Sequence, residues 1–160
     1  MKTLISLPRV LSLILLTVAF SGITSCDKDD DDNNSTSAMY TVSGSSSGSQ
    51  VVPSVSGSAA GTITGSYNAN TNVLTYTMAW TGLSGAATKA SFYTGTSGTN
   101  GTLLQDVSIT TSGSTGAAAG TVTLNDAQEQ SLLNGTMYYV VGTSAHASGE
   151  IRGQITTTHQ

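Results

Sequence analysis

Apolar and polar residues alternate along most of the chain after residue 38, which is the pattern of half-buried β-strands. The clearest example is 73–80, which follows 61–67 after the turn sequence Asn68-Ala69-Asn70-Thr71, so the two stretches predict a hairpin. One face of its second strand would be the core side: Leu74, Tyr76, Met78 and Trp80. Further strands are predicted at 39–43, 90–94, 103–109, 117–124, 137–141 and 149–157.

One segment departs from this alternation and predicts a short helix near 125–134. Asn125 can cap its N-terminus together with Gln128, and Asp126 and Glu129 favour the positive end of the helix dipole. Gly135 would end the helix. Eight or so short strands with one short helix predict an all-β fold, an antiparallel β-sandwich.

The first 25 residues have the parts of a secretory signal peptide: basic Lys2 and Arg9, an apolar run at 11–20, and small or polar residues at 21–25. The apolar run is half of the about 20 residues that a transmembrane helix needs. Ile23-Thr24-Ser25-Cys26 resembles the lipobox of bacterial lipoproteins. That resemblance implies that 1–25 is cleaved and that Cys26 carries a diacylglycerol and an N-acyl chain such as palmitate, which attach the protein to a membrane. The alternative is a buried cysteine in a plain secreted protein.

Five of the nine acidic residues lie within 27–32, at the start of a polar segment, 26–38. Such a segment has too little apolar surface to fold, so it predicts a disordered tether. Cys26-Asp-Lys-Asp-Asp also resembles the export signal that sends lipoproteins of Bacteroidota to the outer face of the outer membrane. A calcium site built from the carboxylates and a merely solvating spacer are the alternatives for this run.

The remaining 39–160 has the length of one domain and contains very few charges. Lys89 and Arg152 stand against four carboxylates, at positions 106, 126, 129 and 150, so its net charge is −2. Nucleic-acid binding needs clustered Lys and Arg, and we therefore expect no nucleic acid as a partner.

Several blocks of this domain resemble CHRD domains, the modules named after chordin. They are Gly48-Ser-Gln-Val-Val-Pro53, Trp80-Thr-Gly-Leu-Ser-Gly85, Gly120-Thr-Val-Thr-Leu-Asn-Asp-Ala-Gln128, Leu132-Leu133-x-Gly135 and Gly149-Glu-Ile-Arg-Gly-Gln154. The last block is the most specific, with Gly149, Glu150, Arg152, Gly153 and Gln154 as a motif expected to be structural. The resemblance implies an immunoglobulin-like β-sandwich similar to Cu/Zn superoxide dismutase, in secreted or surface proteins of microbes.

The chain departs from the histidine pattern of many microbial CHRD sequences. At the positions that align with that family's histidines it has Ser91, Tyr93 and Gly142, which supply no imidazole. Its own histidines, His146 and His159, have no partner at metal-ligand spacing, so we expect them to be a solvated loop residue and a tail residue. We therefore expect no metal, no cofactor and no catalytic residues.

Glu150 and Arg152 lie two apart and are expected on one strand face, as an ion pair, or with Arg152 bonding carbonyls of a neighbouring loop. A ligand contact is the functional alternative. Tyr76 and Trp80 are expected in the core, whereas Tyr93, Tyr138 and Tyr139 are candidates for stacking on a ligand, and 94–102 and 142–148 for contact loops.

The sequence thus predicts a lipid-anchored envelope protein of the outer membrane, facing outward, with a non-catalytic binding or structural module for an unidentified surface ligand or protein. The alternative is a metal-dependent enzyme of superoxide-dismutase-like ancestry. A passive filler of the envelope is a third possibility.

Overall fold

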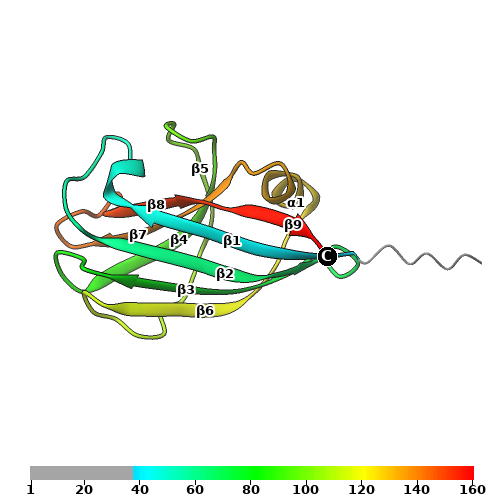
Figure 1. The fold of residues 1–160 in the computed structure, drawn as a ribbon, viewed down its shortest axis with the longest axis horizontal. Helices are drawn as coiled ribbons and strands as arrows, with labels where there is room; N and C mark the ends of the chain where they lie inside the picture. Colours follow the sequence, from blue (N-terminus) through cyan, green and yellow to red (C-terminus); the bar gives the residue numbers. More distant parts are fainter. Residues whose placement is uncertain (1–37) are drawn as a thin grey trace, which may run out of the picture. The chain divides into compact units, whose positions relative to one another are not determined.

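The computed structural model describes residues 38–160, in which nine antiparallel strands form one curled sheet (Figure 1). The all-β prediction with one short α-helix is confirmed. The strands are β1 (Met39–Ser47), β2 (Ala60–Asn68), β3 (Val73–Thr81), β4 (Ala87–Thr94), β5 (Thr102–Asp106), β6 (Gly116–Thr123), β7 (Met137–Thr143), β8 (Ile151–Gln154) and β9 (Thr156–His159). The helices are the 3-10 turn η1 (Gly48–Gln50) and α1 (Asp126–Leu133).

The N-terminal expectations concern residues that precede the described part. The expected signal peptide 1–25, the lipid attachment residue Cys26 and the tether 26–38, apart from Ala38, lie outside the described residues. Within 38–160, no helix is long and apolar enough to cross a membrane.

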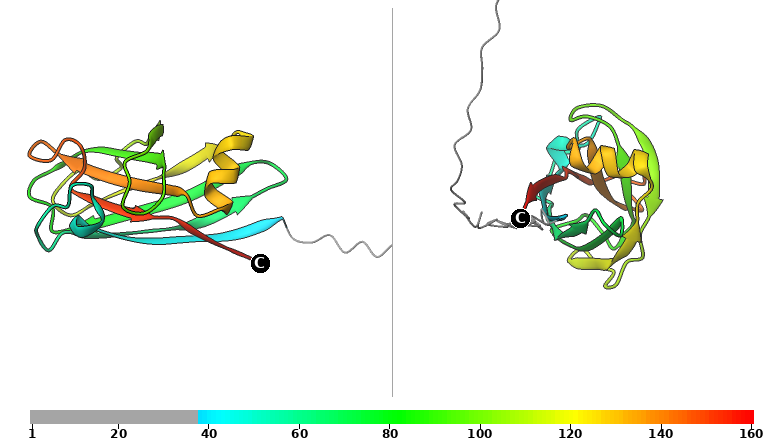
Figure 2. Two further views of the ribbon diagram at one scale, coloured as in Figure 1. Left: turned by 90° about the horizontal axis from the view of Figure 1, so that it is seen from above. Right: turned by 90° about the vertical axis from the view of Figure 1, so that its right-hand side faces the viewer.

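The sheet folds over on itself into two layers (Figures 1 and 2). The strand order is β5-β4-β7-β8-β1-β2-β3-β6, with β9 added to β1. One layer contains β5, β4, β7 and β8, and the other contains β1, β2, β3 and β6. The two layers are joined at a single register pair, Ser47 of β1 with Arg152 of β8. The sandwich therefore turns its corner at the strand that carries the Gly149–Gln154 block.

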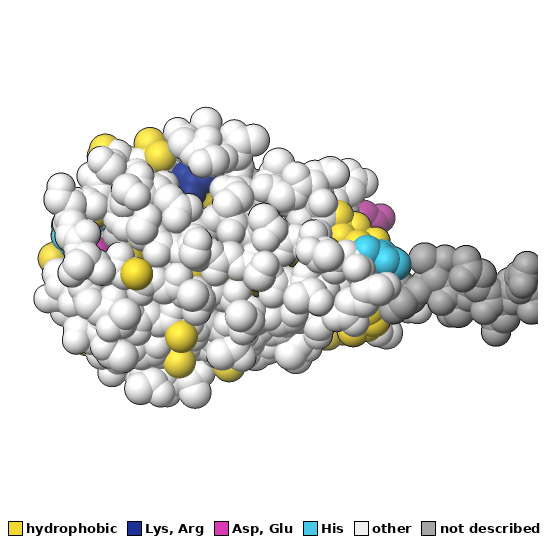
Figure 3. Space-filling model, in the orientation of Figure 1, with side chains coloured by type: hydrophobic (Ala, Val, Ile, Leu, Met, Phe, Trp, Pro, Cys, Tyr) yellow, Lys and Arg dark blue, Asp and Glu magenta, His cyan; other side chains and the backbone are white. Residues whose placement is uncertain are grey.

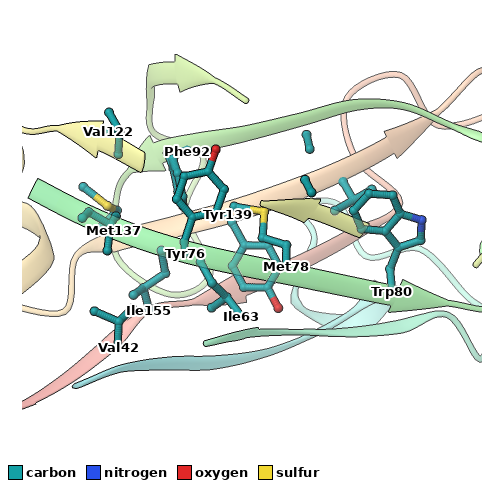
Figure 4. Close-up of a cluster of buried hydrophobic side chains, with 14 of the residues drawn as sticks. Val42, Ile63, Tyr76, Met78, Trp80, Phe92, Val122, Met137, Tyr139 and Ile155 are labelled. Carbon is teal, nitrogen blue, oxygen red and sulfur yellow. The ribbon is translucent and has the colours of Figure 1, made fainter. Parts of the chain in front are cut away.

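Apolar side chains from both layers fill the space between them (Figure 4). The predicted core face of β3 is confirmed, because all four of its members are buried: Leu74, Tyr76, Met78 and Trp80. The Trp80 indole N–H donates to the Gly113 carbonyl at 3.1 Å, so the one polar atom of this side chain is satisfied. Phe92 of β4 packs edge-on against Tyr76, with ring centroids 5.1 Å apart.

Local signals determine the helix as predicted. Asn125 and Gln128 form the capping box, since the N–H of each residue donates to the side chain of the other at 3.0 Å. Gly135, with φ 68°, ends the helix, and its N–H donates to the Leu132 carbonyl at 3.1 Å. Leu132 is fully buried and anchors α1 to the core.

Two predicted strands run on past the point where the strand in the structure ends, whereas the predictions at 39–43 and 90–94 were too short. The stretch 149–157 is divided into β8 and β9 at Ile155, whose side chain is fully buried and whose N–H donates to the Met137 carbonyl at 2.9 Å. The chain changes partner there, from β7 to β1. The stretch 103–109 ends early as β5, because Val107 bonds to the Ala90 carbonyl at 2.9 Å as the chain leaves the sheet edge.

Candidate functional site

The outer face of β4, β7 and β8 carries the candidate site. Side chains alternate along these strands, so Phe92, Tyr139 and Ile151 point into the core. Their neighbours point outward: Lys89, Tyr93, Tyr138, Val140 and Arg152. The strand register places Tyr93 beside Tyr138, and Val140 beside Arg152.

Two tyrosines and an arginine form a stack on this face. The rings of Tyr93 and Tyr138 are nearly parallel, at 13°, with centroids 5.3 Å apart. The Arg152 guanidinium lies 3.6 Å from the centroid of the Tyr138 ring. Tyr138 and Tyr139 are only 3% and 0% exposed, so the expectation that they could stack on a ligand was wrong, and of the three only Tyr93 is partly exposed.

Lys89 lies four residues before Tyr93 on β4 and reaches the same stack. Its ammonium donates a hydrogen bond to the Tyr93 hydroxyl and lies 5.2 Å from the ring centroid. These two contacts together place the ammonium beyond the phenol oxygen and close to the plane of the ring. It therefore leaves the face of the Tyr93 ring uncovered, and it keeps two N–H donors for other partners.

Arg152 holds the loop 95–101 over the sheet. Its guanidinium donates to the carbonyls of Thr99 at 2.6 Å and Thr96 at 2.8 Å. The Gly101 N–H donates to the Tyr138 hydroxyl at 3.0 Å, which closes the other end of the loop. Of the arrangements expected for Arg152, the bond to loop carbonyls is present. The ion pair with Glu150 is not formed.

Glu150 is engaged by other partners, Ser84 and Thr143. It is 4% exposed, and its carboxylate accepts from the Ser84 N–H at 2.6 Å, the Ser84 hydroxyl at 2.7 Å and the Thr143 hydroxyl at 2.7 Å. Burial alone would raise its pKa, but these hydrogen bonds outweigh burial and hold the pKa below its usual value. The carboxylate ties the start of β8 to the loop after β3 and to the end of β7.

The rest of the Gly149–Gln154 block also makes close contacts. Gly149 has φ 131°, which favours glycine, and an added Cβ would lie 2.5 Å from a methyl of Val140. At Gly153 an added Cβ would lie 2.5 Å from the Ser45 carbonyl oxygen. The Gln154 amide donates to the carbonyls of Gly95 and Gly135, both at 2.9 Å. Glu150, Arg152, Gly153 and Gln154 therefore each contact a segment that is distant in sequence.

The stack forms the floor of a cleft of about 510 Å³, which we call the outer-face cleft. Its walls come from three loops: 51–53, 100–101 and 147–148. The Asn100 amide donates to the Val52 carbonyl at 3.0 Å and so joins two of these walls. The cleft is lined by Val51, Val52, Pro53, Lys89, Tyr93, Asn100, Gly101, Tyr138, Val140, Ala147, Ser148 and Arg152. Figure 3 shows how sparse Lys and Arg side chains are on one face of the molecule.

Both loops expected as contact surfaces contribute to this one cleft, because Asn100 and Gly101 come from the first and Ala147 and Ser148 from the second. The wall at 51–53 was missed. No local signal in a Val-Val-Pro sequence shows that it will lie beside the loop 95–101. Only the long-range bond from Asn100 to Val52 shows it.

The histidines lie apart from the cleft lining. His159 is exposed, as expected of a solvated residue, but it lies in β9 and not in an irregular tail, and its ring packs edge-on against Tyr40 at 4.9 Å. His146 is in the loop after β7, and its N–H donates to the Thr143 carbonyl at 3.2 Å. Across 38–160, no three His, Cys, Asp or Glu side chains lie close enough together to hold a metal ion.

Comparison with known proteins gives one match. A family model described as CHRD domain matches residues 42–155, well over half of the chain and nearly all of its β-sandwich. No curated protein and no solved structure matches the chain.

Proposed function

The chain belongs to the CHRD domain family, and we propose that it is a lipid-anchored envelope protein whose single CHRD domain is a non-catalytic binding module. The outer-face cleft is the observation that carries the binding role. Its volume of about 510 Å³ falls within the range of small-ligand sites, about 300–1,000 Å³. Its walls are loops on a rigid sandwich, which is where proteins commonly place recognition surfaces.

The side chains of the lining suit recognition better than chemistry. Its ionisable groups are Lys89, Tyr93, Tyr138 and Arg152. Two of them hold the loop 95–101, since Arg152 donates to its carbonyls and the Tyr138 hydroxyl accepts from Gly101. Lys89 and the partly exposed Tyr93 remain for a ligand, as one cationic donor and one ring face. The nearest carboxylate along the chain, Glu150, is occupied by Ser84 and Thr143.

The anchoring role rests on the N-terminal sequence. Cleavage before Cys26 leaves this residue as an acylated N-terminus, and two or more acyl chains hold a protein stably on a bilayer. The acidic segment 26–38 then acts as the tether that presents the domain outward. The resemblance of Cys26-Asp-Lys-Asp-Asp to an export signal supports the outer face of the outer membrane in a bacterium of the Bacteroidota.

Membrane fractionation tests the anchor. The wild-type protein is expected in the membrane fraction, with an N-terminal peptide whose mass includes a diacylglycerol and an acyl chain on Cys26. The Cys26→Ser variant is expected to be unacylated and absent from that fraction. A wild-type protein recovered without acyl chains would overturn the anchor.

Trypsin treatment of intact cells tests the outward orientation. Lys28 lies in the expected tether, so cleavage there should release the folded domain into the medium. The control is the same treatment after lysis. Release only after lysis would place the domain on the inner side of the membrane.

Metal analysis of the purified full-length protein tests the non-catalytic assignment. We expect less than stoichiometric zinc and copper. Either metal at one equivalent, retained through purification, would overturn this part of the proposal and favour the metal-dependent enzyme.

A further inference from the structure

The outer-face cleft gathers the positive charge of the domain. Lys89 and Arg152 are the only Lys or Arg between residues 38 and 160, and both line this cleft. The four carboxylates of the same range lie outside its lining. Glu150 is bound by Ser84 and Thr143, and Asp106 accepts from the Ser91 hydroxyl. A domain of net charge −2 therefore presents a concave region of opposite sign.

The two cationic side chains, Lys89 and Arg152, have different roles in this cleft. Arg152 is 2% exposed and bound to carbonyls, so it contributes charge without a carboxylate to neutralise it. Lys89 is half-buried and uses one N–H on the Tyr93 hydroxyl, which leaves two donors for a ligand. A ligand carboxylate at Lys89 would accept a charge-assisted hydrogen bond from the ammonium. The positive charge of Arg152 would attract the same carboxylate.

The remaining lining suits a ring that carries hydroxyl groups. The partly exposed Tyr93 ring has one face against Tyr138, and Lys89 does not cover the other. Val52 and Pro53 supply an apolar wall. Asn100 and Ser148 supply side-chain oxygens. A sugar has this mixture of an apolar C–H face and polar edges, whereas a purely aromatic ligand would leave the polar wall unpaired.

We propose that the outer-face cleft binds an acidic sugar, with the carboxylate at the Lys89 ammonium and the ring against Tyr93. This inference rests on the proposed binding function and names the ligand class of that site. Because the main attraction is a partly exposed ion pair, binding weakens as ionic strength rises.

Calorimetric titration of the full-length chain carrying Cys26→Ser tests the ligand class. The probes are digalacturonate, the neutral disaccharide of galactose and benzoate, each at 20 mM and 300 mM NaCl. Digalacturonate is expected to bind at least tenfold more tightly than either other probe at low salt, and several-fold more weakly at high salt. Lys89→Met should reduce its affinity about tenfold.

Thr121→Glu is the matched control, because it makes the same change in net charge at an exposed position of β6 in the other layer. It should leave the affinity for digalacturonate unchanged, and both variants should unfold at the wild-type temperature. Equal loss in both variants, or equal affinity for the neutral disaccharide, would overturn the acidic-sugar assignment while leaving a binding module in place. No binding by any of the three probes would overturn the assignment. If binding is also absent across a broad panel of neutral and charged glycans, the proposed binding function fails as well.

Discussion

Alternate residues of β4, β7 and β8 point to the inside and the outside of the sandwich. Phe92, Tyr139 and Ile151 point inward, where apolar side chains of both layers cover them. Tyr93, Tyr138 and Arg152 belong to the outer face, where the loop 95–101 is held by hydrogen bonds to a buried cation. The inner face is closed by packing and the outer face by directed polar contacts. We therefore expect truncation of apolar inner-face side chains to cost the most stability, and outer-face substitutions to cost less and chiefly to loosen the cleft.

The largest expected effect comes from a neighbouring pair on β4. Phe92→Ala removes a fully buried ring that packs on Tyr76, so it should lower the free energy of unfolding by about 3–5 kcal/mol. Tyr93→Ala, one residue further, should cost less because the ring is partly exposed. Urea unfolding at pH 7 measures both. An equal cost at the two positions would contradict the difference between the faces.

Arg152 tests the polar closure of the outer face. Arg152→Met keeps much of the side-chain volume but loses the bonds to Thr96 and Thr99, which should cost about 2–3 kcal/mol. Arg152→Lys should recover little, since an ammonium lacks the planar fork that bonds two carbonyls while stacking on Tyr138.

Hydrogen exchange shows which part of the domain the Arg152 substitutions loosen. Amides of the loop 95–101 should exchange faster in both Arg152 variants, whereas amides of β3 should be altered only through the change in global stability. Unchanged exchange at the Gly101 amide, which donates to Tyr138, would show that the loop does not depend on Arg152.

Glu150 extends the comparison to a buried charge outside the cleft. Glu150→Gln should cost about 1–3 kcal/mol at pH 7, because the amide replaces an acceptor of three hydrogen bonds. The hydrogen bonds lower the pKa of Glu150, so its contribution is present above the unfolded value of about 4.3 and is lost as the pH falls through the folded pKa. The difference between wild type and variant, measured by urea unfolding, should therefore shrink between pH 7 and pH 3. A difference that does not vary with pH would contradict this account.

Features set by neighbouring residues were predictable from the sequence. The 73–80 face and the Asn125–Gln128 capping box depend on alternation and on residues three apart, and both are confirmed. The break at Ile155 was not predictable, because alternation continues through it. The change of partner from β7 to β1 is decided by segments more than 100 residues apart along the chain.

In the candidate site, too, local features were predictable from the sequence and long-range contacts were not. Glu150 and Arg152 were expected on one face of a regular strand, but β8 begins at Ile151 and Gly149 has φ 131°, so the alternation does not extend to Glu150. The contact loops were predicted as connections between strands at one end of the sandwich, whereas their meeting beside Tyr93 depends on strand register. The exposure of adjacent tyrosines also escaped prediction, since the loop 95–101 that covers Tyr138 is ordered by Arg152.

Adjacent tyrosines on β7 give the smallest expected effect and a direct contrast in sign. The Tyr138 hydroxyl, on the outer face, accepts from the Gly101 N–H at 3.0 Å, so Tyr138→Phe should cost about 0.5–1.5 kcal/mol. The Tyr139 hydroxyl, on the inner face, is buried near the side chain of Ser46, yet neither hydroxyl makes a hydrogen bond of normal geometry among the described residues. Tyr139→Phe removes this unpaired group and should stabilise the domain by up to about 1 kcal/mol. Thermal unfolding compares the two variants. A loss of stability in Tyr139→Phe would show that its hydroxyl is satisfied in solution, and that the inner face includes a polar contact.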